Sequence, residues 1–256
     1  MLLLLLACPD VRDVYQPSAG DTADTGNDPV ETEEHCGTIS SDTTWRADRQ
    51  HLVTCDVVVE RGTLTIEGGV TVLFDERTGL QVATEGYAAG LQVSGESGGV
   101  TLSASSSAGW SGVEIGELAT SVRLAGLVVR DATGGVVIEG AEVTVVGLGI
   151  DGTSDAGLTL SGGARLAEGA EGVTVTHAGG YAVVADVATA HTLPAVASAY
   201  TGNGTDAVYL SGDEITTSVE WEDLGVPYVL AETVDVGGSA GEPAVFTVAE
   251  GTELRF

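Results

Sequence analysis

The sequence contains no lysine, and its nine basic residues, all arginines, face 38 aspartates and glutamates, giving a formal net charge of −29. Affinity for nucleic acid depends on clustered cations, so we expect no nucleic-acid partner. The simplest interpretation of this charge is a solvated, self-repelling acidic surface. The alternative is divalent cation binding. No Ca²⁺-loop pattern of the D-x-D-x-D-G kind occurs, so we expect no cofactor and keep only calcium open.

Aromatic residues make up only 5% of the 256 residues, although 43% are hydrophobic. The core must therefore be built from Val, Leu, Ile and Ala, and a sugar-binding cleft made by stacking on rings is disfavoured. This length allows one large domain or two small ones. The 37 glycines follow no collagen-like period. Together with abundant Val and Thr they favour many short strands joined by tight turns.

Amphipathic helices and common catalytic motifs are missing too. We find no helix-period segment of useful length and no G-x-S-x-G, P-loop or H-E-x-x-H pattern. From Val57 onward, the residues VVVERGTLTIEGGVTVLF alternate with period two and are interrupted by glycine. This pattern is typical of strands.

The N-terminus begins MLLLLLACPD, and its leucine run is too short to cross a bilayer, which needs about 20 apolar residues. The run also lacks the basic start of a signal peptide. Leu5-Leu6-Ala7-Cys8 nevertheless resembles a bacterial lipobox at the end of a lipoprotein signal peptide, here residues 1–8, whose beginning is missing. The resemblance implies that Cys8 carries a diacylglycerol and anchors an exported protein at the outer membrane or cell surface. The alternative is a chance leucine run beside an ordinary cysteine.

An acidic segment follows this cysteine. Residues 9–35 contain three prolines, eight carboxylates and a single arginine, with few apolar side chains. Such a segment cannot bury enough surface to offset its ordering entropy, so we expect a disordered tether. It resembles the linkers of bacterial surface lipoproteins.

The chain has three cysteines, Cys8, Cys36 and Cys55. If Cys8 carries lipid, Cys36 and Cys55 are left to form a disulfide, and the alternative is two free thiols. We expect residues 36–56, with Trp45, to cap the folded part. We expect no metal site there, because His35 and His51 do not have a recognised ligand spacing.

A short element of a small residue followed by alternating aliphatics recurs along the chain. It is centred on Val113, Val136, Leu158, Val183 and Val208, at spacings of 23, 22, 25 and 25 residues. A second set is centred on Val129, Ile150, Val175 and Val196. A period of 20–25 residues with strands and no helices predicts a β-solenoid.

These repeats resemble the right-handed parallel β-helix of the pectin-lyase-like superfamily. The resemblance covers most of residues 57–216 and implies an all-β rod of about seven coils, each with three short strands. A β-propeller is the alternative, but its blades are nearly twice as long and rich in aromatics.

A larger repeat relates residues 41–74 to 217–256. It pairs Trp45 with Trp221 and Phe74 with Phe256, allowing one short insertion. We therefore expect a second, incomplete module at 217–256, and a chain that is a fragment of a longer reading frame.

Polar residues follow successive predicted strands and could line up in one column. Asp131, Asp151, His177 and Asn203 each end or follow a strand, with Arg130 adjacent and Asp155 and Asp186 as possible neighbours. Two carboxylates and an imidazole on one ridge could bind a cation or act as acid and base. The alternative is structural, because Asp, His and Asn are favoured in turns.

The sequence favours a non-enzymatic surface rod for adhesion or envelope structure, which contacts a polysaccharide or a surface protein. One alternative is a polysaccharide lyase or glycoside hydrolase that uses Asp131, Asp151 and His177. The missing lysines and scarce arginines disfavour a lyase with an anionic substrate. The other alternative is a Ca²⁺-dependent carbohydrate-binding module.

Overall fold

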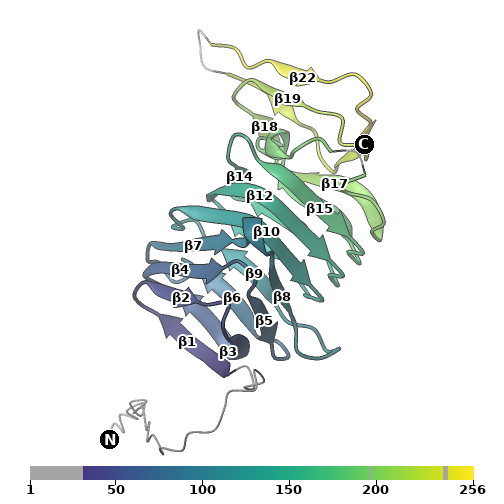
Figure 1. The fold of residues 1–256 in the computed structure, drawn as a ribbon. Coiled ribbons are helices and arrows are strands. Elements are labelled where there is room, and N and C mark those ends of the chain that lie inside the picture. The colour runs from purple at the N-terminus through teal and green to yellow at the C-terminus, as the bar shows by residue number, and fades with distance from the viewer. Residues whose placement is uncertain (1–30, 197, 239–241) are drawn as a thin grey trace, which may run out of the picture.

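The alternating segments form short parallel strands that coil into a β-solenoid of about nine turns, compared with about seven expected (Figure 1). The structure is a computed structural model that describes residues 31–196, 198–238 and 242–256. The all-β parallel fold predicted from the repeats is confirmed. No helix among these residues is long and apolar enough to cross a membrane.

Three parallel ladders, here called faces 1, 2 and 3, form the wall of the solenoid. Face 1 contains β2 (Thr43–Trp45), β4 (Gly62–Glu67), β7 (Ala89–Ser94), the first halves of β10 (Val122–Arg130) and β12 (Glu142–Asp151), and β14 (Arg165–Leu166). Beyond them, β19 (Val219–Trp221) pairs with β22 (Phe246–Val248). Face 2 contains the first halves of β1 (Thr32–Ile39) and β3 (Gln50–Val59), then β5 (Thr71–Phe74), β8 (Val100–Ala104), the second halves of β10 and β12, and β15 (Glu171–Thr176).

Face 3 is the longest ladder and runs through every coil. It contains the second halves of β1 and β3, then β6 (Gly79–Val82), β9 (Gly112–Ile115), β11 (Val136–Glu139), β13 (Leu158–Ser161), β16 (Tyr181–Asp186), β17 (Thr205–Ser211), β20 (Tyr228–Leu230) and β23 (Leu254–Arg255). A short pair, β18 (Glu214–Ile215) with β21 (Asp235–Val236), follows β17 and β20 in the chain. In the part of the chain that the structure describes, the helical segments are two 3₁₀ turns, η1 (Gly95–Ser97) and η2 (Ala190–Thr192).

The first repeated element forms a continuous column in the core. Its five members are paired in register along face 3, and none is more than 2% exposed: Val113, Val136, Leu158, Val183 and Val208. Each aliphatic side chain therefore packs on its equivalent in the next coil, which is how a solenoid buries a continuous core.

The second repeated element is confirmed for three of its four members. Val129, Ile150 and Val175 are paired along face 2. The fourth position is Tyr200 rather than Val196. The amide of Val175 donates to the carbonyl oxygen of Ala199 at 2.7 Å, and in a parallel ladder this bond goes to the residue before the partner, which is the fully buried Tyr200. Val196 is 43% exposed. After η2 the chain around Val196 is no longer in a strand, so the alternating apolar residues there do not belong to a ladder.

Glycine recurs in these elements because the coils approach closely before face 3. Gly135 has a φ of +61°, and a Cβ atom there would lie 2.0 Å from the carbonyl oxygen of Gly157. A Cβ atom at Gly112 would lie 2.4 Å from the carbonyl oxygen of Gly135. Only glycine combines this backbone conformation with so close an approach.

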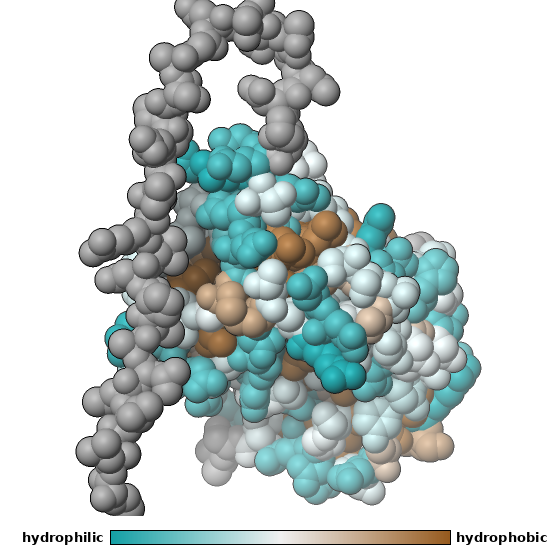
Figure 2. All heavy atoms as spheres, turned by 90° about the horizontal axis from the view of Figure 1, so that it is seen from below, coloured by the Kyte–Doolittle hydropathy of each residue, from teal (hydrophilic) through white to brown (hydrophobic). Residues whose placement is uncertain are grey.

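The N-terminal coils contain the segment that we expected to be a separate cap. Residues 36–56 lie in β1, β2 and β3, which pair in the same ladders as the later coils, and the first strand begins at Thr32. Figure 2 shows this end of the molecule, where hydrophilic side chains surround scattered apolar ones. Cys8 and most of the expected tether lie outside the described residues.

The predicted disulfide between Cys36 and Cys55 is present and joins β1 to β3, with the two Cα atoms 4.8 Å apart. It ties the first strand of the solenoid covalently to the next coil. The strands it joins already pair on both sides of the bridge.

The C-terminal residues 217–256 continue faces 1 and 3. Trp45 pairs with Ile66 and Trp221 with Val248, so the two tryptophans are equivalent as the larger repeat predicts. Phe74 and Phe256 are not equivalent. Phe74 lies in face 2, whereas Phe256 follows β23 of face 3.

Candidate functional site

The predicted ridge lies where the strands of face 2 end, and its register differs from the expected column. Asp151 pairs with Arg130 on one side and Thr176 on the other. Asp131 and His177, which follow these partners, are therefore equivalent to Gly152 rather than to Asp151. The expected single column is thus offset by one residue at Asp151.

Backbone conformation explains which residues occupy this turn. Asp131, Gly152 and His177 have positive φ values of 56°, 76° and 53°. Glycine adopts this left-handed conformation freely, and Asp and His are among the side chains that tolerate it best. The turn geometry alone therefore accounts for these residue types.

An exposed imidazole–carboxylate pair bridges two coils of the ridge. The Nδ1 atom of His177 lies 2.8 Å from Oδ1 of Asp151, and the hydroxyl of Thr176 donates to the same oxygen at 3.2 Å. The bond from His177 is the main cause that lowers the pKa of Asp151, against an opposing effect of burial. The side chains are 76% exposed for His177 and 42% for Asp151, so solvent screens the pair.

The other predicted ridge residues serve the backbone or lie apart. Asn203 accepts from the amide of Ala178 at 3.0 Å and donates to the carbonyl of Val175 at 3.1 Å. Asp186 ends β16 of face 3 and accepts from the amide of Gly163 at 2.8 Å. Asp155 is exposed in the turn before β13. The ridge proper is therefore Asp131, Asp151 and His177.

A hollow of about 500 Å³ lies beside this ridge. Its wall contains the serine-rich loop after β8 together with Asp131, Gly152 and Ser154. The hydroxyl of Ser103 donates to Oδ2 of Asp131 at 3.3 Å. Hydroxyls and a carboxylate around an open hollow suit a hydrogen-bonding ligand such as a sugar. The imidazole–carboxylate pair next to it has the geometry of a general base.

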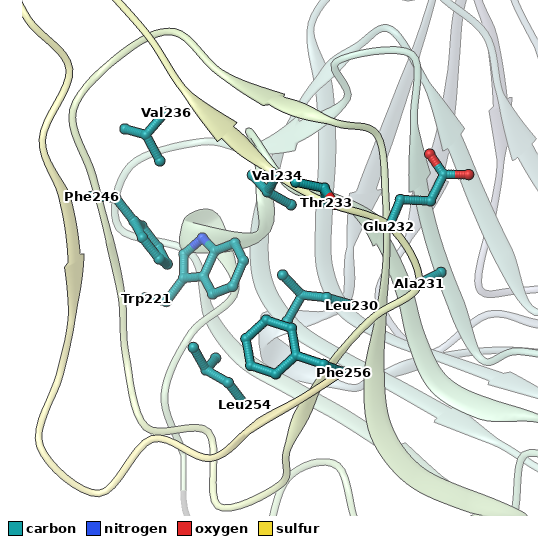
Figure 3. Close-up of a pocket in the computed structure, with 10 residues that line it drawn as sticks. All are labelled: Trp221, Leu230, Ala231, Glu232, Thr233, Val234, Val236, Phe246, Leu254 and Phe256. Atoms are coloured by element: carbon teal, nitrogen blue, oxygen red, sulfur yellow. The ribbon is translucent and has the colours of Figure 1, made fainter.

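An apolar hollow of about 540 Å³ lies at the C-terminal end of the core (Figure 3). Trp221, Leu230 and Phe246 point into it, and Phe256 at its rim is 92% exposed. The indole nitrogen of Trp221 is buried without a hydrogen-bond partner. Trp221 and Leu230 belong to the coil that contains β19 and β20, and Phe246 and Phe256 belong to the next one, which contains β22 and β23.

A third group, at the N-terminal end, contains His35 and His51, where the sequence analysis expected no metal site. Glu33, His35 and His51 each place one potential ligand atom within 4.8 Å of the others. The pKa of His35 is lowered to about 4, mainly by burial and also by the nearby His51, while Glu33 acts in the opposite direction. The alternation that points Glu33 and His35 to one side of β1 was readable in the sequence, but the pairing with His51 was not.

Comparison of the chain with protein-family models, with curated proteins and with solved structures gives no match.

Proposed function

We propose that the protein is a non-enzymatic rod displayed on a bacterial surface, anchored through lipid on Cys8 and used for adhesion or envelope structure. We include in the proposal the likeness of its repeats to a right-handed, pectin-lyase-like β-helix, which the parallel β-solenoid fold supports. The partner would be a polysaccharide or another surface protein.

The observation that carries this proposal is that the ridge side chains form hydrogen bonds between neighbouring coils. Asp151 accepts bonds from His177 and Thr176 of the next coil, and Asp131 accepts one from Ser103 of the previous coil. The side chain of Asn203 bonds to the backbone of Ala178 and Val175 in the previous coil. Each of these bonds joins one coil to the next, which is what a rigid rod requires of its turn residues.

The disulfide supports the proposal that the protein is exported. Disulfides persist in exported proteins and are rare in the reducing cytosol, so the Cys36–Cys55 bond favours a chain that leaves the cytoplasm. A charge of −29 supports a soluble surface that resists association. The lipid anchor itself rests on the lipobox resemblance around Cys8.

The second candidate function is a polysaccharide lyase or glycoside hydrolase acting at the ridge. The exposed pair of His177 and Asp151 beside the hollow next to Asp131 favours it. A Ca²⁺-dependent carbohydrate-binding module would use the same hollow, with the carboxylates of Asp131 and Asp151 as ligands.

The anchor is tested by Cys8→Ser. When the chain follows the basic start of a lipoprotein signal peptide in a bacterial host, we expect the parent in the membrane fraction. Cys8→Ser should move to the soluble exported fraction, because the acyl chains supply the membrane affinity. The matched control, Cys36→Ser with Cys55→Ser, should stay with the membrane. Retention of Cys8→Ser in the membrane fraction would show that the anchor is elsewhere.

A further inference from the structure

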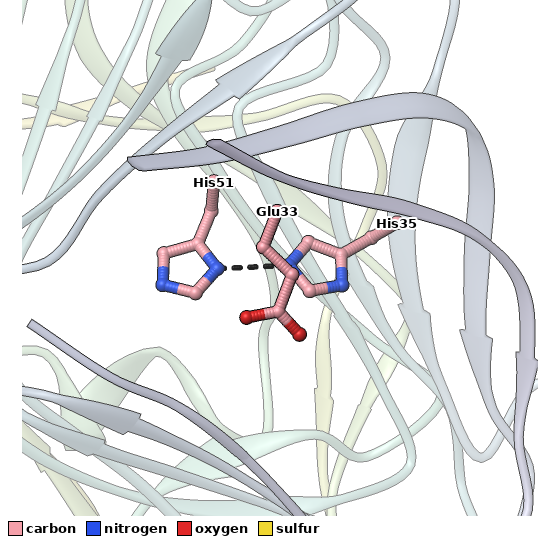
Figure 4. A group of neighbouring side chains, drawn as sticks. All are labelled: Glu33, His35 and His51. Atoms are coloured by element: carbon pink, nitrogen blue, oxygen red, sulfur yellow. Dashed lines mark hydrogen bonds between the residues drawn. The ribbon is translucent and has the colours of Figure 1, made fainter. Parts of the chain in front are cut away.

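Two histidines and a glutamate meet at the N-terminal end of the core (Figure 4). Glu33 and His35 lie on the same side of β1, and Glu33 pairs in register with His51 of β3. The Nε2 atom of His35 lies 2.8 Å from Nδ1 of His51. The alternation of β1 and its pairing with β3 thus bring together three side chains that are separated by up to 18 residues.

The far nitrogen of His51 is held by a backbone carbonyl. Its Nε2 atom lies 2.9 Å from the carbonyl oxygen of Arg46. A carbonyl can only accept, so Nε2 carries the proton and Nδ1 presents its lone pair toward His35 and Glu33. A hydrogen bond of this kind on the distal nitrogen orients most metal-binding histidines and fixes their tautomer.

Trp45 and the disulfide hold the rings of His35 and His51 in place. The indole of Trp45 stacks on His35 at 4.4 Å and on His51 at 5.7 Å between ring centroids, and both Trp45 and His51 are fully buried. The disulfide at Cys36, next to His35, fixes the spacing of β1 and β3. Glu33 and His35 are only partly buried, which leaves an entry path from solvent.

We propose that Glu33, His35 and His51 form a binding site for a divalent transition metal, most suitably Zn²⁺. The ligands would be Nε2 of His35, Nδ1 of His51 and the carboxylate of Glu33, with a water in the fourth position. Two histidines and a glutamate are a common donor set for zinc. The site is independent of the ridge and of the proposed surface role.

Binding requires one proton shift and a small movement. In the metal-free protein His35 donates its Nε2 proton to His51. On binding, Nε2 gives up this proton and Nδ1 of His35 takes one up, so the ring stays neutral. Nitrogens bound to one tetrahedral zinc at about 2.0–2.1 Å lie about 3.3–3.4 Å apart. The rings must therefore separate by about 0.5 Å, which His35 can provide because β1 is the first strand of the described ladder. The alternative is a structural role, in which the hydrogen bond between His35 and His51 only helps to close the end of the core.

The test is a titration of the full chain with ZnCl₂ after treatment with a chelator. We expect saturation at one equivalent and a rise in the melting temperature, because a ligand that binds only the folded state stabilises it. X-ray absorption at the zinc edge should report two imidazole nitrogens in the first shell.

The variants separate this site from adventitious binding to the acidic surface. His35→Gln and Glu33→Gln, both at partly buried positions, should lose at least tenfold in Zn²⁺ affinity while keeping the circular dichroism of the parent. His177→Gln removes the exposed histidine beside Asp151 and should leave the affinity unchanged. Absence of a one-equivalent transition in the parent, or equal affinity of His35→Gln and the parent, would overturn the proposal.

Discussion

Replacing Gly135 with alanine is expected to destabilise the solenoid by about 3 kcal/mol or more, the sum of left-handed backbone strain and a steric overlap. The new Cβ atom would lie 2.0 Å from the carbonyl oxygen of Gly157, a backbone atom of the next coil that cannot swing away. The coils above and below Gly135 must then separate locally. The midpoint of urea unfolding, followed by circular dichroism, measures the loss.

Gly163→Ala is the matched control for this variant. Gly163 has a φ of +81°, but nothing lies within 4 Å of the position of its missing Cβ. This variant incurs only the backbone strain, about 1–2 kcal/mol. If Gly135→Ala and Gly163→Ala unfold at the same urea concentration, the coils do not approach as closely as described.

Replacing both Cys36 and Cys55 with serine is expected to lower the free energy of unfolding by about 3 kcal/mol. The disulfide closes a loop in the unfolded chain and so lowers the entropy of the unfolded state. The loop spans a sequence separation of 19 residues. In a solenoid each coil is stabilised mainly by its neighbours, so the loss should concentrate in β1 and β3 at the end of the rod.

Amide hydrogen exchange would localise this effect. We expect faster exchange in β1 and the first half of β3 of the double serine variant, and unchanged exchange in β11 and β13. The Cys8→Ser variant, which keeps the disulfide, should exchange like the parent. Uniformly faster exchange along the whole rod would contradict the picture of coils that are each stabilised mainly by their immediate neighbours.

The parts of the fold that could be predicted from the sequence are those in which a local pattern repeats. The column from Val113 to Val208 follows from period-two alternation and a glycine before each strand, and the observed pairing has the predicted spacing. The disulfide was predicted from the cysteine count. After η2 the chain leaves the strand pattern, and the position equivalent to Val175 is Tyr200 instead of the predicted Val196.

The remaining differences arise from register, which local patterns do not encode. A one-residue offset separates Asp151 from Asp131 and His177, although all three end or follow strands. Glu33 and His35 have ordinary spacing, and only the pairing of β1 with β3 brings His51 to them. Phe256 aligned with Phe74 by sequence, but no face 2 strand lies between β22 and β23, so Phe256 follows a strand of face 3.

The central claim, a rod without catalytic activity, is tested most directly by incubating the protein with a panel of neutral and acidic polysaccharides, with and without Ca²⁺. The assay follows new reducing ends and unsaturated sugars. We expect neither product, and we expect Asp131→Ala with Asp151→Ala to bind any polysaccharide that the parent binds. Cleavage by the parent that disappears in this double variant would contradict the account and place an active site at the ridge.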